Sequence, residues 1–201
     1  MSAEARRRWA ALVLLLPSPA ALAHVSALPH DGLLAGLLHY LGAPQWPLGA
    51  AVLGLLAAQR GRDAVAWSVL ALPAALAAGA LLSGVVAAWP PAGAAAVGMT
   101  LLLGMLVALA VPLPAVAAPL LALPVGVLQG IGVQAAAHGD GGPIMAALGI
   151  ALGGQLVVTT VAMLASAGVA WRWQSVAVRA LGSWIAAIGL LTLAARLAGY
   201  G

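Results

Sequence analysis

The sequence predicts an all-α fold, a polytopic membrane bundle of about six transmembrane helices. Two observations carry this prediction. Hydrophobic residues make up 64% of the 201 residues and charged residues only 6%, whereas an ordinary soluble domain has about 45–50% and about 25%. Apolar segments of about 20 residues, the length that a spanning helix needs, follow one another along nearly the whole chain.

Composition also argues against several classes of function. The chain has no cysteine, which excludes disulfides, thiolate metal sites and cysteine nucleophiles. The predicted interior holds no paired carboxylates and no Ser-His-Asp set, so we do not expect an enzyme. The sequence pI is near 11.2, but the arginines lie in the N-terminal segment and beside the predicted helices. We interpret them as topology signals and expect no nucleic-acid partner.

The N-terminus has the pattern of an export signal. Arg6 to Arg8 form a positive region, and Trp9 to Leu16 form an apolar segment that is too short to span a membrane. Pro17 follows, and Ala21-Leu22-Ala23 has the small-x-small form of a cleavage site. We therefore predict that residues 1–23 are a signal peptide, cleaved to leave His24 first. The alternative is an uncleaved, tilted N-terminal helix.

Residues 24–201 are predicted to form one domain. Its six spans are expected at about Leu33–Ala58, Ala64–Ala88, Ala92–Val111, Ala115–Ala137, Ile144–Ala170 and Val176–Ala198. Gly42, Pro44 and Pro47 interrupt the first span, and we expect them to kink it or divide it into two half-helices.

Charge predicts the orientation. An exported N-terminus places the loops with Arg60, Arg62, Arg172 and Arg179 inside, as the positive-inside rule requires, and an even number of spans returns the C-terminus outside. The chain lacks lysine, asparagine and phenylalanine, which is typical of a GC-rich, bacterial genome. The prediction is thus a multi-pass protein of the bacterial inner membrane with both mature termini outside.

Glycines four residues apart recur in the apolar segments. The pairs are Gly32 with Gly36, Gly126 with Gly130, and Gly149 with Gly153. Such spacing lets two helix backbones approach closely. We interpret these pairs as packing sites, either within the chain or between the copies of a homo-oligomer or the members of a larger membrane complex.

A few polar residues fall inside the predicted spans, where lipid offers them no partner. Counting about 1.5 Å per residue from the outer ends places His39 roughly 10 Å deep, Gln129 roughly 12 Å deep and Gln155 nearer the midplane. Gln45 marks the break in the first span, and Thr159 lies one turn below Gln155. These groups form either a substrate site open to the outside or interhelical hydrogen bonds that fix packing. For the amides and Thr159 we favour packing, and for His39 both interpretations stay open.

The predicted outer leader offers a second set of polar groups. A mature N-terminal His24 provides an amine and an imidazole on one residue, a chelating pair for copper or nickel ions. His30 and Asp31 lie on the same side of the membrane. The alternative is that these residues are merely solvated by water.

The order of these features resembles that of a known family. A signal peptide ending in Ala-His, a leader with His and Asp, and a broken first span that opens Gly32-Leu-Leu-Ala-Gly36-Leu-Leu-His39 are similar to the HupE/UreJ family. This resemblance covers essentially the whole chain in span number and spacing. It implies a six-helix permease or accessory protein linked to nickel and cobalt supply for hydrogenase and urease.

The first-span signature of that family has the form His-Pro-x-x-Gly-x-Asp-His. This chain reads His39-Tyr-Leu-Gly42-Ala-Pro44-Gln45-Trp46. The first histidine is retained, whereas Gln45 and Trp46 stand where the family has Asp and the second His.

Two further family positions differ. The fourth span of the family carries a His-Gly-x-x-His-Gly pattern, where this chain has Leu128-Gln129-Gly130-Ile131-Gly132 without either histidine, and Val158 or Thr159 replaces the histidine of the fifth span. The resemblance therefore implies His24, His30, Asp31 and His39 as candidate ligands for nickel, cobalt or copper.

Two functions follow from the sequence. In the first, the protein handles transition-metal ions, nickel or cobalt, from the outer face. In the second, it has kept the scaffold without transport and is an accessory subunit that packs against a larger membrane complex.

Overall fold

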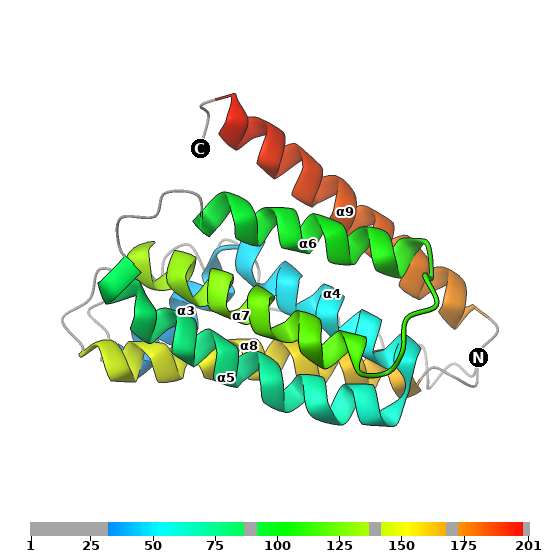
Figure 1. The fold of residues 1–201 in the computed structure, drawn as a ribbon, viewed down its shortest axis with the longest axis horizontal. Coiled ribbons are helices and arrows are strands. Elements are labelled where there is room, and N and C mark those ends of the chain that lie inside the picture. Colours follow the sequence, from blue (N-terminus) through cyan, green and yellow to red (C-terminus); the bar gives the residue numbers. More distant parts are fainter. Residues whose placement is uncertain (1–31, 87–91, 137–141, 168–172, 199–201) are drawn as a thin grey trace, which may run out of the picture.

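The computed structural model describes residues 32–86, 92–136, 142–167 and 173–198. Within these ranges the chain forms helices and no strands, so the predicted all-α fold is confirmed. The helices, labelled as in Figure 1, are α3 (Gly32–Gly42), α4 (Gln45–Arg60), α5 (Arg62–Val86), α6 (Ala92–Ala108), α7 (Ala117–Ala136), α8 (Pro143–Ala167) and α9 (Gln174–Leu197).

The helices have the length and composition of membrane spans. Four of them, α5, α7, α8 and α9, are each long and apolar enough to cross a bilayer, and the bent pair α3 and α4 passes the same test as one broken span. Large apolar side chains cover their outer faces, as shown by Leu120, Trp184 and Leu191, which are all more than half exposed. A surface of this kind suits a lipid bilayer, and the chain is a multi-pass membrane protein.

The first span is broken where the sequence predicts it. Helix α3 ends at Gly42, α4 begins at Gln45, and the two are bent by 75°. Pro44 precedes α4, and Pro47 lies in its first turn. The N–H groups of a first turn have no acceptor within the helix, so a proline there costs no intrahelical hydrogen bond. The amide of Trp46 donates to the Ala43 carbonyl at 3.1 Å, which closes the turn between the two half-helices.

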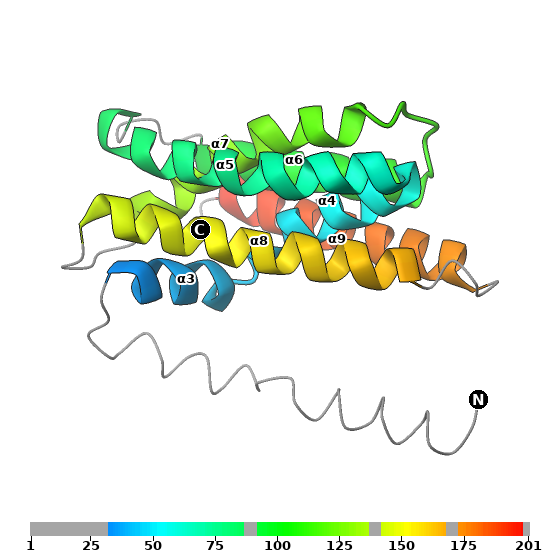
Figure 2. The same ribbon diagram turned by 90° about the horizontal axis from the view of Figure 1, so that it is seen from below.

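Helix α4 is the centre of the bundle, and the other helices pack around it in pairs. It contacts α5, α6, α7, α8 and α9, and nine of its 16 residues are buried. The main pairs around it are α5 with α7, α6 with α9 and α3 with α8. Figure 2 shows α3 lying along α8, and Figure 1 shows α9 crossing α6.

Glycines bring the backbones of these pairs together. A Cβ atom on Gly36 would collide with the Ala146 carbonyl of α8, and one on Gly79 would collide with the backbone of Val127 on α7. A Cβ on Gly104 would lie 2.7 Å from the Ala186 amide of α9. The glycine spacings at 32/36, 126/130 and 149/153 therefore serve packing within the chain, since at least one glycine of each pair lies against a neighbouring helix.

Helix α6 is shorter than the span predicted at Ala92–Val111, because it ends at Ala108 after 17 residues. Ala110 has a φ of 50°, which takes the chain out of the helix before the two prolines that follow. The Val107 carbonyl accepts from Gln59 Nε2 at 3.1 Å, and the Ala108 carbonyl accepts from Arg179 Nε at 2.9 Å. The Val107 carbonyl also accepts from the Ala110 amide at 3.1 Å. The Arg179 side chain of α9 thus satisfies the Ala108 carbonyl, which the early helix end leaves open.

Candidate functional site at the break in the first span

Tyr40 occupies the centre of the site. It lies in the last turn of α3 and is fully buried. Its hydroxyl lies 3.2 Å from Gln129 Oε1 on α7 and 3.3 Å from the Trp46 carbonyl oxygen on α4. One phenolic proton is therefore placed between two acceptors, and a single side chain links both halves of the broken span to α7.

Glycines make the space that Tyr40 occupies. A Cβ atom on Gly153 of α8 would lie 2.9 Å from the Tyr40 ring, and one on Gly154 would lie 3.6 Å from its hydroxyl. On the other side, a Cβ on Gly132 of α7 would lie 2.7 Å from the Trp46 indole. The missing side chains thus seat two large aromatic residues at the break.

Gln129 enters the same centre from α7. It is 1% exposed, and its amide group fills the place where a Gly49 side chain would stand on α4. The Thr100 hydroxyl of α6 lies 3.0 Å from that same Cβ position and donates to the Ala96 carbonyl at 3.0 Å. Within the described residues, Gln129 Nε2 is buried and has no acceptor, so the centre holds one amide donor that the protein leaves unsatisfied.

His39 is the one described residue among the predicted metal ligands. It lies in the last turn of α3, directly before Tyr40, and it is half-buried. Adjacent residues of a helix point about 100° apart, so His39 does not share the direction of the Tyr40 side chain. His39 therefore lies beside the break, and Tyr40 points into the bundle.

The other predicted polar residues lie apart from Tyr40. Gln155 Nε2 donates to Thr159 Oγ1 at 2.9 Å, one turn along α8, and both side chains are half-buried. Gln45 begins α4 at the break and is also half-buried. The structure thus joins Gln129 to Tyr40 and, separately, Gln155 to Thr159.

The predicted signal peptide and the leader ligands His24, His30 and Asp31 lie outside the described residues. In the ranges that the structure describes, no group of three or more His, Cys, Asp or Glu side chains could hold a metal ion. The groups gathered at the break are a phenol, amides, a hydroxyl and backbone carbonyls, which are neutral hydrogen-bonding groups.

Sequence reasoning missed Tyr40 and Thr100 as members of this site. Tyr40 is one of only two tyrosines in the chain, and it stands next to the histidine that the family resemblance singles out. A phenol within an apolar span needs a hydrogen-bond partner. The presence of Tyr40 in the first span was therefore the signal that could have placed it in a polar site. Thr100 gave none, because a threonine that bonds its own helix backbone is common in spans.

Comparison with known proteins places this chain in a family. No curated protein and no solved structure matches the chain significantly. The family model described as HupE / UreJ protein matches residues 12–192, which is most of the chain and includes α3 to α8 and most of α9. The protein therefore belongs to the HupE/UreJ family.

Proposed function

We propose that the protein handles divalent transition-metal ions, nickel or cobalt, which reach it from the outer face of the membrane. The observation that carries this proposal is the place of His39, in the last turn of the half-helix α3 and directly before the 75° break. Membership of the HupE/UreJ family supports it, because the resemblance to that family implies a permease or accessory protein of metal supply.

The physical chemistry of a broken span suits a cation. The C-terminal end of a helix carries about half a negative charge, and half-helix ends of this kind bind cations in transporters. An imidazole at that end is a good ligand for nickel and cobalt. The outer leader, with His24, His30 and Asp31, would supply further donors on the path to His39.

The same geometry supports a second candidate, an accessory membrane subunit that does not transport. The intramembrane amides are engaged in hydrogen bonds within the protein, with Gln129 joined to Tyr40 and Gln155 joined to Thr159. The first bond holds α3 and α7 together without a ligand, and the second lies within α8. On this interpretation the protein keeps the family fold and packs as an accessory subunit against a larger membrane complex.

The proposed orientation follows the positive-inside rule, with a signal peptide cleaved after Ala23, residues 24–201 as one domain in the bacterial inner membrane, and both mature termini outside. Arg60 and Arg179 support it because they gather at one end of the bundle. Arg60 Nη1 donates to the Leu113 carbonyl at 3.4 Å, and Arg179 donates to the carbonyl of Ala108 in the same segment.

Metal uptake by intact cells tests the proposal. Cells that express the protein, its His39→Ala variant or its His24→Ala variant are supplied with radioactive nickel or cobalt, with equal amounts of protein in the membrane. We expect uptake above the empty vector, lowered by each substitution. Trp184→Leu, on the exposed face of α9, is the control that retains uptake.

Uptake equal to the empty vector would contradict the metal-handling proposal. A partner that co-purifies in mild detergent at a fixed stoichiometry would then favour the accessory subunit.

A further inference from the structure

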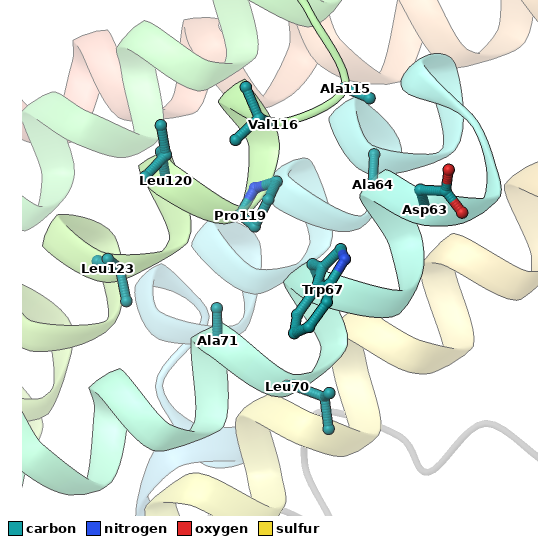
Figure 3. Close-up of a pocket in the computed structure, with 10 residues that line it drawn as sticks. All are labelled: Asp63, Ala64, Trp67, Leu70, Ala71, Ala115, Val116, Pro119, Leu120 and Leu123. Carbon is teal, nitrogen blue, oxygen red and sulfur yellow. The ribbon is translucent and has the colours of Figure 1, made fainter.

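A groove on the outer surface of the bundle, between α5 and α7, is separate from the polar centre. It has a volume of about 630 Å³ and is lined almost entirely by apolar side chains. Figure 3 shows Trp67 of α5 lying opposite Pro119 of α7, with Leu70 and Leu123 farther along the groove. Trp67, Leu70 and Leu120 are each more than half exposed, so the groove faces whatever surrounds the bundle.

One end of the groove is charged. Asp63, the second residue of α5, lines it, and it is the one acidic side chain in the ranges that the structure describes. In those ranges Asp63 makes no ion pair and no side-chain hydrogen bond. Its carboxylate is therefore available to a cation outside the chain, although Arg60 and Arg62 are close in sequence.

The groove runs in the direction of a lipid molecule. Asp63 stands at the start of a 25-residue span, the level at which headgroups lie, and Trp67 follows one turn deeper, where interfacial aromatic residues are found. Ala71 and Leu123 continue the lining deeper into the span. From the end of the span inward, the groove thus presents a carboxylate, then an indole ring, then hydrocarbon side chains.

The size of the groove suits a small ligand. Its volume is about 630 Å³. It lies within the range of sites that enclose small ligands, about 300–1,000 Å³.

We propose that this groove binds one phospholipid whose headgroup carries a primary ammonium group, with the ammonium at Asp63 and an acyl chain along Trp67 and Leu120. The carboxylate attracts the ammonium, and the Trp67 ring adds a cation–π attraction. Asp63 also lies in the first turn of α5, where a negative charge stabilises the helix. The helix-stabilising role of Asp63 affects protein stability and leaves lipid selectivity unchanged. A measurement of lipid selectivity therefore distinguishes it from the ammonium-binding role.

Fluorescence quenching tests the proposal. The full-length protein is reconstituted in phosphatidylcholine vesicles with an equal mole fraction of dibrominated phosphatidylethanolamine or dibrominated phosphatidylglycerol. The chain has seven tryptophans, so the Trp67 signal is the difference between the parent protein and Trp67→Leu. We expect the ethanolamine lipid to associate with Trp67 about threefold more strongly than the glycerol lipid, which is the size of an exposed ion pair.

Three variants complete the design. Asp63→Asn keeps the shape and removes the charge, and we expect the preference to fall to about one. Ala71→Phe fills the groove floor and should reduce quenching of Trp67 by both lipids. Trp184→Leu on α9 is the matched control and should leave the preference unchanged.

Equal quenching by the two lipids in the parent protein would overturn the proposal, as would a preference that survives Asp63→Asn. The absence of quenching of Trp67 by either lipid would also overturn it, because a protein segment or a second copy would then cover the groove. None of these outcomes bears on metal handling at His39.

Discussion

The Tyr40 hydroxyl lies 3.2 Å from the amide oxygen of Gln129, 89 positions later in the chain. This contact joins α3, the first half-helix of the broken span, to α7. The same hydroxyl lies within hydrogen-bond distance of the Trp46 carbonyl oxygen in α4, the second half-helix. One buried phenol thus forms a hydrogen bond across the 75° bend between the two half-helices.

Removing that hydroxyl tests its contribution to stability. Tyr40→Phe keeps the ring and leaves Gln129 Oε1 without its donor, and we expect a loss of about 1 kcal/mol in the free energy of unfolding. Unfolding in mixed detergent micelles, followed by circular dichroism, measures it. In the double variant with Gln129→Leu, the loss should be smaller than the sum of the two single losses. Additive losses would show that the two side chains are not coupled.

Gly49 gives a second test of the polar centre. Gly49→Ala forces the Gln129 amide out of its place, and we expect a loss of about 1–3 kcal/mol from overpacking. Gln129→Ala in the same chain should recover part of that loss, because the amide is then absent. Gly84→Ala is the matched control, since nothing lies within 4 Å of a Cβ atom there. A Gly49 variant as stable as this control would contradict the packing described.

The contact of α5 with α7 predicts the effect of a larger residue at Gly79. A Cβ atom there meets the Val127 backbone, which cannot move as a side chain end can, so Gly79→Ala should lower the unfolding free energy by about 1–3 kcal/mol. The measurement is made on the monomeric protein in detergent. Unchanged stability of the monomer would indicate that the two helix backbones do not approach each other at Gly79.

Capping of α6 predicts a role for Arg179. Its guanidinium donates to the Ala108 carbonyl at the helix end, where a positive charge is favourable. We expect Arg179→Gln to cost about 0.5–1 kcal/mol and to increase hydrogen exchange at the last turn of α6, while α8 is unaffected. Exchange that rises equally in α6 and α8 would argue for a general effect instead of a lost cap.

The sequence was sufficient for much of the fold. The apolar segments located the spans, and the run from Gly42 to Pro47 located the break, because glycine and proline interrupt helices for local reasons. The end of α6 at Ala108 was not predictable in this way, since Gln59 and Arg179 from distant parts of the chain donate to its last carbonyls.

The candidate site was predictable only in part. Gln129 stood out as a polar residue in an apolar span, but a strongly apolar helix gives little sign of which face is buried, so its partner Tyr40 was not identified. Gln129 bonds Tyr40 of the first span, a residue outside the predicted polar set. Gln155 instead bonds Thr159 on its own helix.

Metal binding by the purified protein tests the central claim most directly. Isothermal titration of nickel or cobalt into the protein in lipid nanodiscs compares the parent with His39→Ala, and both retain the leader with His24. We expect binding by the parent and a loss of affinity of about tenfold or more in the variant, the size found when a metal site loses a supporting group. Equal affinity in the two proteins, or no binding to the parent, would contradict the claim.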